Sequence, residues 1–226
     1  AANDTALSLD AGTGTVAVDG AIGGTDGIGT FTVSAASQAD LAAIEDAATI
    51  AVTAGNIDLN AATYAASSGP LTLTGDVDLD LSAGTVALTT TNEALTVTGT
   101  IDDDSAGDSA LTLTTGIGSV DLQGDAGSTT ALGAFTLASA SQADLADVTA
   151  ASLAVTADNI DLNDATYTAT TGGVTFTGAV DLDAGAVTTT VDSSAGNGAI
   201  AFTSTVDDAA NDTALSLDAG TGTVAV

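Results

Sequence analysis

The chain has 226 residues, 30 of them acidic and none of them lysine, arginine or histidine, so its net charge is −30. Without cationic side chains it cannot neutralise phosphates, which excludes nucleic acid as a partner and disfavours an anionic membrane surface. Apolar residues still make up 45% of the chain and alternate with polar ones, a pattern typical of short β-strands rather than of a disordered or membrane-inserted segment.

The first 18 residues, AANDTALSLDAGTGTVAV, return without a change at residues 209–226. A tandem array explains this better than a fold with its own beginning and end, so we expect residues 1–208 to form one full repeat and residues 209–226 to start the next. Within the repeat, SQADLA at 37–42 recurs at 141–146, and NIDLN at 56–60 recurs at 159–163. The repeat is therefore divided into two diverged halves, residues 1–104 and 105–208.

Short segments of alternating apolar and polar residues begin at regular intervals along both halves. They start at Leu7, Phe31, Ile50, Leu71 and Leu95, then at Leu111, Phe135, Leu153, Val174 and Ile200, and again at Leu215. A second segment follows each of the first five, at Val16, Leu41, Ile57, Val77 and Ile101, and a weaker third apolar position comes after it. The whole pattern returns about every 21 residues, a period that indicates a repeat architecture.

Three short strands in about 21 residues describe one turn of a three-faced parallel β-helix, in which stacked turns share a continuous core. We therefore predict an all-β solenoid with about ten turns in each 208-residue repeat and with Gly and Asp at the corners. Tandem immunoglobulin-like β-sandwiches are the alternative, since about 100 residues is their usual size.

The solenoid interpretation predicts which side chains stack. One inward column should contain Leu7, Phe31, Ile50, Leu71 and Leu95. Leu215 should occupy the place of Leu7 on the next repeat. The outermost turns are expected to lack polar caps, so that the solenoid continues end to end, covalently or by stacking on a second copy.

Two clusters of aspartate are the candidate metal sites. The first contains Asp76, Asp78 and Asp80 on the outer face of one strand, and the second contains Asp102, Asp103, Asp104 and Asp108 in one loop. Oxygen-rich clusters suit Ca²⁺, but the first cluster has Leu81 where an EF-hand loop needs glycine. The competing interpretation is a solvated acidic face with no ordered ion.

The inventory of side chains argues against catalysis, because no cysteine, histidine or lysine is present to act as nucleophile, base or Schiff-base former. We therefore expect no enzyme. Outward threonine pairs, such as Thr72/Thr74 and Thr96/Thr98, are predicted to stack in rows. Such a flat threonine array resembles the ice-binding face of certain insect antifreeze solenoids, which makes ice binding a remote alternative. Alanines interrupt this row, at Ala51, Ala138, Ala154 and Ala201.

Several segments resemble the repeat regions of filamentous-haemagglutinin-like giant surface proteins of bacteria. They are ALSLDAGTGTVAVDGAIGG from residue 6, TLASASQADLADV from residue 136, LAVTADNIDLN from residue 153 and GGVTFTGAVDLDAG from residue 172. The resemblance covers nearly the whole chain and implies a right-handed parallel β-helix in a very long secreted adhesin or filament.

Together these features favour a structural segment of an extracellular or cell-surface filament, stalk or fibre. Its expected partners are further copies of itself, joined end to end or bundled laterally, and cations that neutralise its charge. An adhesin shaft or a calcium-dependent adhesion protein is the main alternative. A binding module should show an aromatic patch or a non-repeating insertion, and this sequence shows neither.

Overall fold

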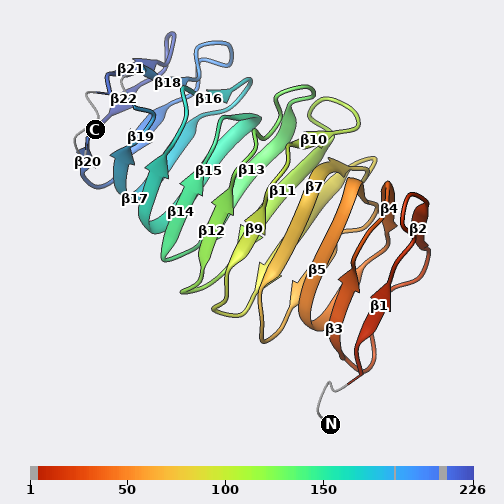
Figure 1. The fold of residues 1–226 in the computed structure, drawn as a ribbon. Helices are drawn as coiled ribbons and strands as arrows, with labels where there is room; N and C mark the ends of the chain where they lie inside the picture. Colours follow the sequence, from red (N-terminus) through yellow and green to blue (C-terminus); the bar gives the residue numbers. More distant parts are fainter. Residues whose placement is uncertain (1–4, 186, 209–212) are drawn as a thin grey trace.

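The protein is a β-solenoid in which every strand pairing is parallel (Figure 1). The computed structural model describes residues 5–185, 187–208 and 213–226. Residues 1–4 and 209–212, which open the two identical segments, lie outside the described residues. The structure confirms the predicted parallel β-helix, with about nine turns of about 23 residues.

The described residues form strands that run in chain order through the stack. In the first half the strands are β1 (Leu7–Leu9), β2 (Thr15–Val18), β3 (Ile28–Val33), β4 (Gln38–Leu41), β5 (Ile44–Leu59), β6 (Thr63–Ala66), β7 (Leu71–Leu79), β8 (Gly84–Thr90), β9 (Leu95–Val97) and β10 (Ile101–Asp103). In the second half they are β11 (Ser109–Thr114), β12 (Ser119–Leu122), β13 (Leu132–Ser139), β14 (Gln142–Leu145), β15 (Val148–Leu162), β16 (Thr166–Ala169), β17 (Val174–Leu182), β18 (Thr189–Asp192), β19 (Ile200–Phe202) and β20 (Val206–Asp207), followed by β21 (Leu215–Asp218) and β22 (Val224–Ala225).

Strand β7 shows how the sequence produces the turn. Leu71 and Leu73 point into the core while Thr72 and Thr74 point outward, as the two-residue period of a strand requires. Gly75 then bends the chain with a φ of 132°, a conformation that favours glycine. Val77 resumes the inward pattern on the adjacent face, so β7 covers two faces of the solenoid.

Three columns of inward side chains define the three faces. The first face contains Leu7, Phe31, Ile50, Leu71, Leu95, Val120, Ala143, Ile160, Val180 and Val206. The second face contains Val16, Ala39, Ile57, Val77, Ile101, Ala126, Val148, Tyr167, Val191 and Leu217. The third face contains Val86, Leu111, Phe135, Leu153, Val174, Ile200 and Val224, and is preceded by Ile22, Ile44 and Tyr64.

These columns form one continuous hydrophobic core along the solenoid axis. Its largest fully buried side chains include Tyr64, Tyr167, Phe31, Phe135 and Phe176, so the few aromatic residues are concentrated inside. Burying a large apolar side chain stabilises a fold by about 1.5–3 kcal/mol, and each turn gains this only from its neighbours. Leu7 and Val224, on the outermost described turns, are accordingly 37% and 47% exposed.

The predicted stacking of Leu7, Phe31, Ile50, Leu71 and Leu95 is confirmed by the register of the strands. The predicted continuation of this column at Leu111 is wrong. Leu95 is instead followed on the first face by Val120, and Leu111 stacks on Val86 of the third face. The interval of 16 residues between Leu95 and Leu111 spans two faces rather than one turn.

The same error affects the far end of the repeat. Leu215 pairs with Thr189 on the second face, whereas Leu7 lies on the first, so the two residues do not occupy equivalent faces. All three faces use the same alternation of apolar and polar residues, and this alternation alone does not indicate the face on which a segment lies. The repeat consequently contains fewer and longer turns than the expected ten of about 21 residues.

Candidate functional site

A ladder of aspartates lies on the outside of the second face. Asp40, Asp58, Asp78 and Asp102 occupy one column on four successive turns. Each is flanked by inward residues, as Asp58 is by Ile57 and Leu59, so the strand period turns the carboxylate outward. Neighbouring carboxylates in the column are therefore separated by about 4.8 Å along the axis, measured between their strands.

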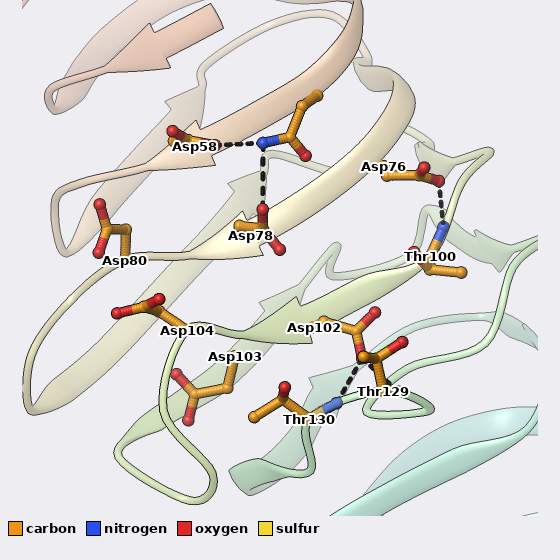
Figure 2. A pocket seen from close by; sticks show the side chains of 11 residues that line it. Asp58, Asp76, Asp78, Asp80, Thr100, Asp102, Asp103, Asp104, Thr129 and Thr130 are labelled. Atoms are coloured by element: carbon orange, nitrogen blue, oxygen red, sulfur yellow. Dashed lines mark hydrogen bonds between the residues drawn. The ribbon is translucent and has the colours of Figure 1, made fainter. Parts of the chain in front are cut away.

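Side-chain amides connect the rungs of this ladder. The Gln38 amide donates to Asp40 Oδ1 at 2.9 Å and also to Asp58 Oδ2. The Asn56 amide donates to Asp58 Oδ1 at 2.6 Å and to Asp78 Oδ2 at 3.0 Å (Figure 2). These neutral donors compensate part of the repulsion between stacked carboxylates in a chain that offers no cationic side chain.

The second half of the repeat contains the same network. The Gln142 amide donates to Asp144 Oδ1 at 2.8 Å and to Asp161 Oδ2 at 2.7 Å. The Asn159 amide donates to Asp161 Oδ1 at 2.7 Å. The ladder to which they belong lies on the first face, and its members are Asp121, Asp144, Asp161, Asp181 and Asp207.

Stacking changes the acidity of the central rungs. Partial burial, the hydrogen bond and charge of Asp40 and the charges of Asp78 and Asp80 raise the pKa of Asp58 to about 6. Burial, followed by the charge of Asp144, also raises the pKa of Asp161, although the hydrogen bond from Gln142 acts in the opposite direction. A proton on either residue therefore relieves repulsion within the ladder.

The two predicted aspartate clusters meet in one shallow hollow of about 490 Å³ (Figure 2). Its lining includes Asp76, Asp78 and Asp80 from the first cluster and Asp102, Asp103 and Asp104 from the second. The structure thus brings together six of the seven predicted residues, because Asp78 and Asp102 lie in register on adjacent turns. Asp108 lies outside this lining.

Backbone amides already satisfy several of these carboxylates. Asp102 Oδ1 accepts hydrogen bonds from the amides of Thr129 and Thr130, at 2.8 and 3.0 Å, and Asp76 Oδ1 accepts one from Thr100 at 3.2 Å. Asp103 is 3% exposed, and its Oδ2 accepts from the amides of Asp108 and Ser109.

No group of three or more acidic side chains within the described ranges is arranged to hold one metal ion. The hollow presents Asp80 and Asp104 to solvent as exposed carboxylates (Figure 2). Calcium binding by the seven aspartates therefore stays a prediction, and the geometry gives no ordered ligand set for it.

The sequence analysis missed the connecting role of Gln38 and Asn56. The signal was present, because both belong to the recurring motifs SQADLA and NIDLN. Their place between stacked aspartates depends on the register of adjacent turns, which the motifs alone do not give.

The expected threonine rows are divided between two faces. Thr72 and Thr96 stack on the first face, and Thr112 and Thr136 stack on the third. Alanine interrupts both rows, since Ala51 neighbours Thr72 and Ala154 neighbours Thr136. The single long threonine plane that motivated the ice-binding alternative is thus replaced by two shorter ones.

Comparisons with known proteins add no identification: no family model, no curated protein and no solved structure matches the chain. In residues 5–185, 187–208 and 213–226, no helix is long and apolar enough to cross a membrane.

Proposed function

We propose that this chain is one repeat and the start of the next in the shaft of an extracellular filament or surface fibre. Its contribution is mechanical: it keeps the ends of a long molecule apart and resists bending. Cations from the medium neutralise its charge, and its partners are further copies of the same repeat.

One observation supports this proposal above the others. The solenoid stacks without interruption from β1 to β22 within the described residues, while its sequence begins again at residue 209. A second repeat with the same sequence can form the same pairings on the preceding turn, so a tandem array makes one continuous parallel stack. Hydrogen bonds along the axis then resist extension and bending at every turn.

The surface chemistry agrees with a solvated shaft. The two largest fully buried residue types, tyrosine and phenylalanine, are in the core, and the outer strand positions hold mainly Thr, Ser, Ala and Asp. With 30 acids and no basic side chain, the outer surface repels its own copies at low ionic strength. Lateral bundles of such shafts therefore require cations between them.

Immunogold electron microscopy of intact cells of the source organism tests the proposal. An antibody raised against the folded chain should label rows of sites along fibres outside the cell. Labelling confined to permeabilised cells, or scattered single sites without fibres, would contradict it. An antibody preadsorbed with the purified chain provides the control for specificity.

A further inference from the structure

The two halves of the repeat have similar sequences but lie on different faces of the solenoid. Val16 lies on the second face, where it pairs with Ala39. Its equivalent Val120, 104 residues later, lies on the first face between Leu95 and Ala143. The next equivalent, Val224, lies on the third face beside Ile200. Each half-repeat thus moves the same residue by one face.

The reason is a fractional number of turns in each half-repeat. From Leu7, four turns along the first face reach Leu95. Two further faces, at Ile101 and Leu111, then bring the chain to the equivalent of Leu7 on the third face. A half-repeat therefore spans four and two-thirds turns, and only three half-repeats complete a whole number of turns.

The amide-linked ladders follow this shift. Asp40 and Asp58 lie on the second face, and their equivalents Asp144 and Asp161 lie on the first. Ala225, the equivalent of Ala17 at the start of the ladder, has already moved to the third face, where it pairs with Ala201.

From this register we infer that a tandem array displays the same surface on three sides in rotation, so that its aspartate ladder winds around the shaft as a band. The inference rests on the proposed array. A given ladder returns to the same face after about 14 turns, or roughly 67 Å of rise at about 4.8 Å per turn. No face is acidic over its whole length, so repulsion between stacked carboxylates does not accumulate on one side and bend the shaft that way. A partner that recognises one ladder would meet it on a given face only at that spacing.

Cysteine pairs test the two junctions at which the surface changes face, and the chain has no cysteine of its own. The first-junction pair is Thr96→Cys with Asp121→Cys, and the second-junction pair is Ala201→Cys with Ala225→Cys. The reference pair, Thr72→Cys with Thr96→Cys, lies within one half-repeat. The contrast pair, Thr96→Cys with Thr112→Cys, would be adjacent only if 16 residues made one turn.

After mild oxidation, intact mass measured with alkylation of the remaining thiols reports the fraction of each disulfide. Neighbouring parallel strands are about 4.8 Å apart, within the Cα separation that a disulfide spans. Both junction pairs should close as fully as the reference pair, and the contrast pair should stay reduced. A closed contrast pair, or a junction pair that stays reduced while the reference closes, would overturn the inference.

Spin labels on the same cysteines give a reading that does not depend on bond formation. The junction pairs should show the interspin distance of the reference pair, and the contrast pair a longer one; equal distances for the contrast and reference pairs would overturn the inference. Both measurements report strand register alone. They can fail while immunogold labelling still supports a filament, and they can succeed where that labelling fails.

Discussion

The carboxylates of Asp40 and Asp58 lie side by side on adjacent turns, and the side-chain amide of Gln38 donates hydrogen bonds to both. This arrangement places two negative charges about one strand spacing apart, with a third at Asp78 on the following turn. Partial burial and these neighbours together raise the pKa of Asp58 to about 6, above the value of about 3.9 expected in an unfolded chain.

Mild acidification should therefore stabilise the protein. A carboxyl group whose pKa is higher in the folded state binds its proton more tightly there, so stability rises as the pH falls through about 6 toward about 4 and is lost in the opposite direction. Thermal unfolding followed by circular dichroism should give a higher Tm at about pH 5 than at about pH 7.5. A Tm that falls over this interval would contradict the explanation based on the ladder.

Substitution identifies the residue responsible. Asp58→Asn should raise the Tm at about pH 7.5, where the wild-type carboxylate is charged, and should reduce the gain on acidification. Asp26→Asn, which removes a charge from an exposed loop, provides the matched control and should leave most of the gain in place. Equal gains in the wild type and in Asp58→Asn would assign the effect to general charge repulsion instead.

The two tyrosines act as equivalent internal braces. The Tyr64 hydroxyl donates to the Leu41 carbonyl at 2.6 Å, and the Tyr167 hydroxyl donates to the Leu145 carbonyl at 2.7 Å. Tyr64→Phe and Tyr167→Phe should each lower the free energy of unfolding by about 1–3 kcal/mol, because a buried carbonyl loses its donor. Urea denaturation measures this, and the outward Thr72→Val should change the same quantity by less than about 0.5 kcal/mol.

Burial also raises the pKa of both tyrosine hydroxyls. Absorbance titration of the folded chain should consequently show no tyrosinate at about pH 10.5, where a free tyrosine is mostly ionised. Ionisation that begins near pH 10 without unfolding would place these hydroxyls in contact with solvent.

The corner glycines should tolerate no side chain. A Cβ on Gly75 would lie 1.9 Å from the Ala54 carbonyl oxygen of the adjacent turn, and the φ of Gly75 is 132°. Gly75→Ala should therefore cost at least about 3 kcal/mol of stability, because both the backbone conformation and the spacing between turns must change. Gly20→Ala is the control, since nothing lies within 4 Å of its Cβ, and its effect should be small. Similar losses for the two variants would contradict the close contact between turns.

The alternation within single strands was sufficient to predict the parallel solenoid and the stacking from Leu7 to Leu95. It failed between Leu95 and Leu111, because an apolar–polar–apolar segment has the same form on every face. The intervals between segments could be read as whole turns or as thirds of a turn. Only pairing along the axis, such as that of Leu95 with Val120, distinguishes the two.

The acidic hollow was predicted in part for a related reason. Asp76 and Asp102 are both in aspartate-rich segments, but their proximity depends on the register of β7 with β10. The inward turn of Asp103 was not apparent from the sequence, because it occupies the place that Leu79 holds on the previous turn. Backbone amides of its own loop satisfy it there.

Calcium should stabilise the chain more than sodium does at the same ionic strength. Stacked carboxylates about 4.8 Å apart suit a divalent cation, whereas sodium supplies only screening. Melting in chelator, in calcium and in matched sodium chloride should therefore give the highest Tm in calcium and the lowest in chelator at low salt. Asp78→Asn should reduce the difference between calcium and sodium. Equal melting temperatures in the two salts would contradict calcium binding and leave screening as the only role of cations.

The length of a chain with two complete repeats tests the central claim of a continuous shaft most directly. Adding a second copy of residues 1–208 should lengthen the particle by about 45 Å, at about 4.8 Å per turn, with an unchanged cross-section. Small-angle X-ray scattering and negative-stain electron microscopy both measure these dimensions, and the chain with one repeat is the control. A particle with two lobes joined at variable angles, or one that widens without lengthening, would contradict the account.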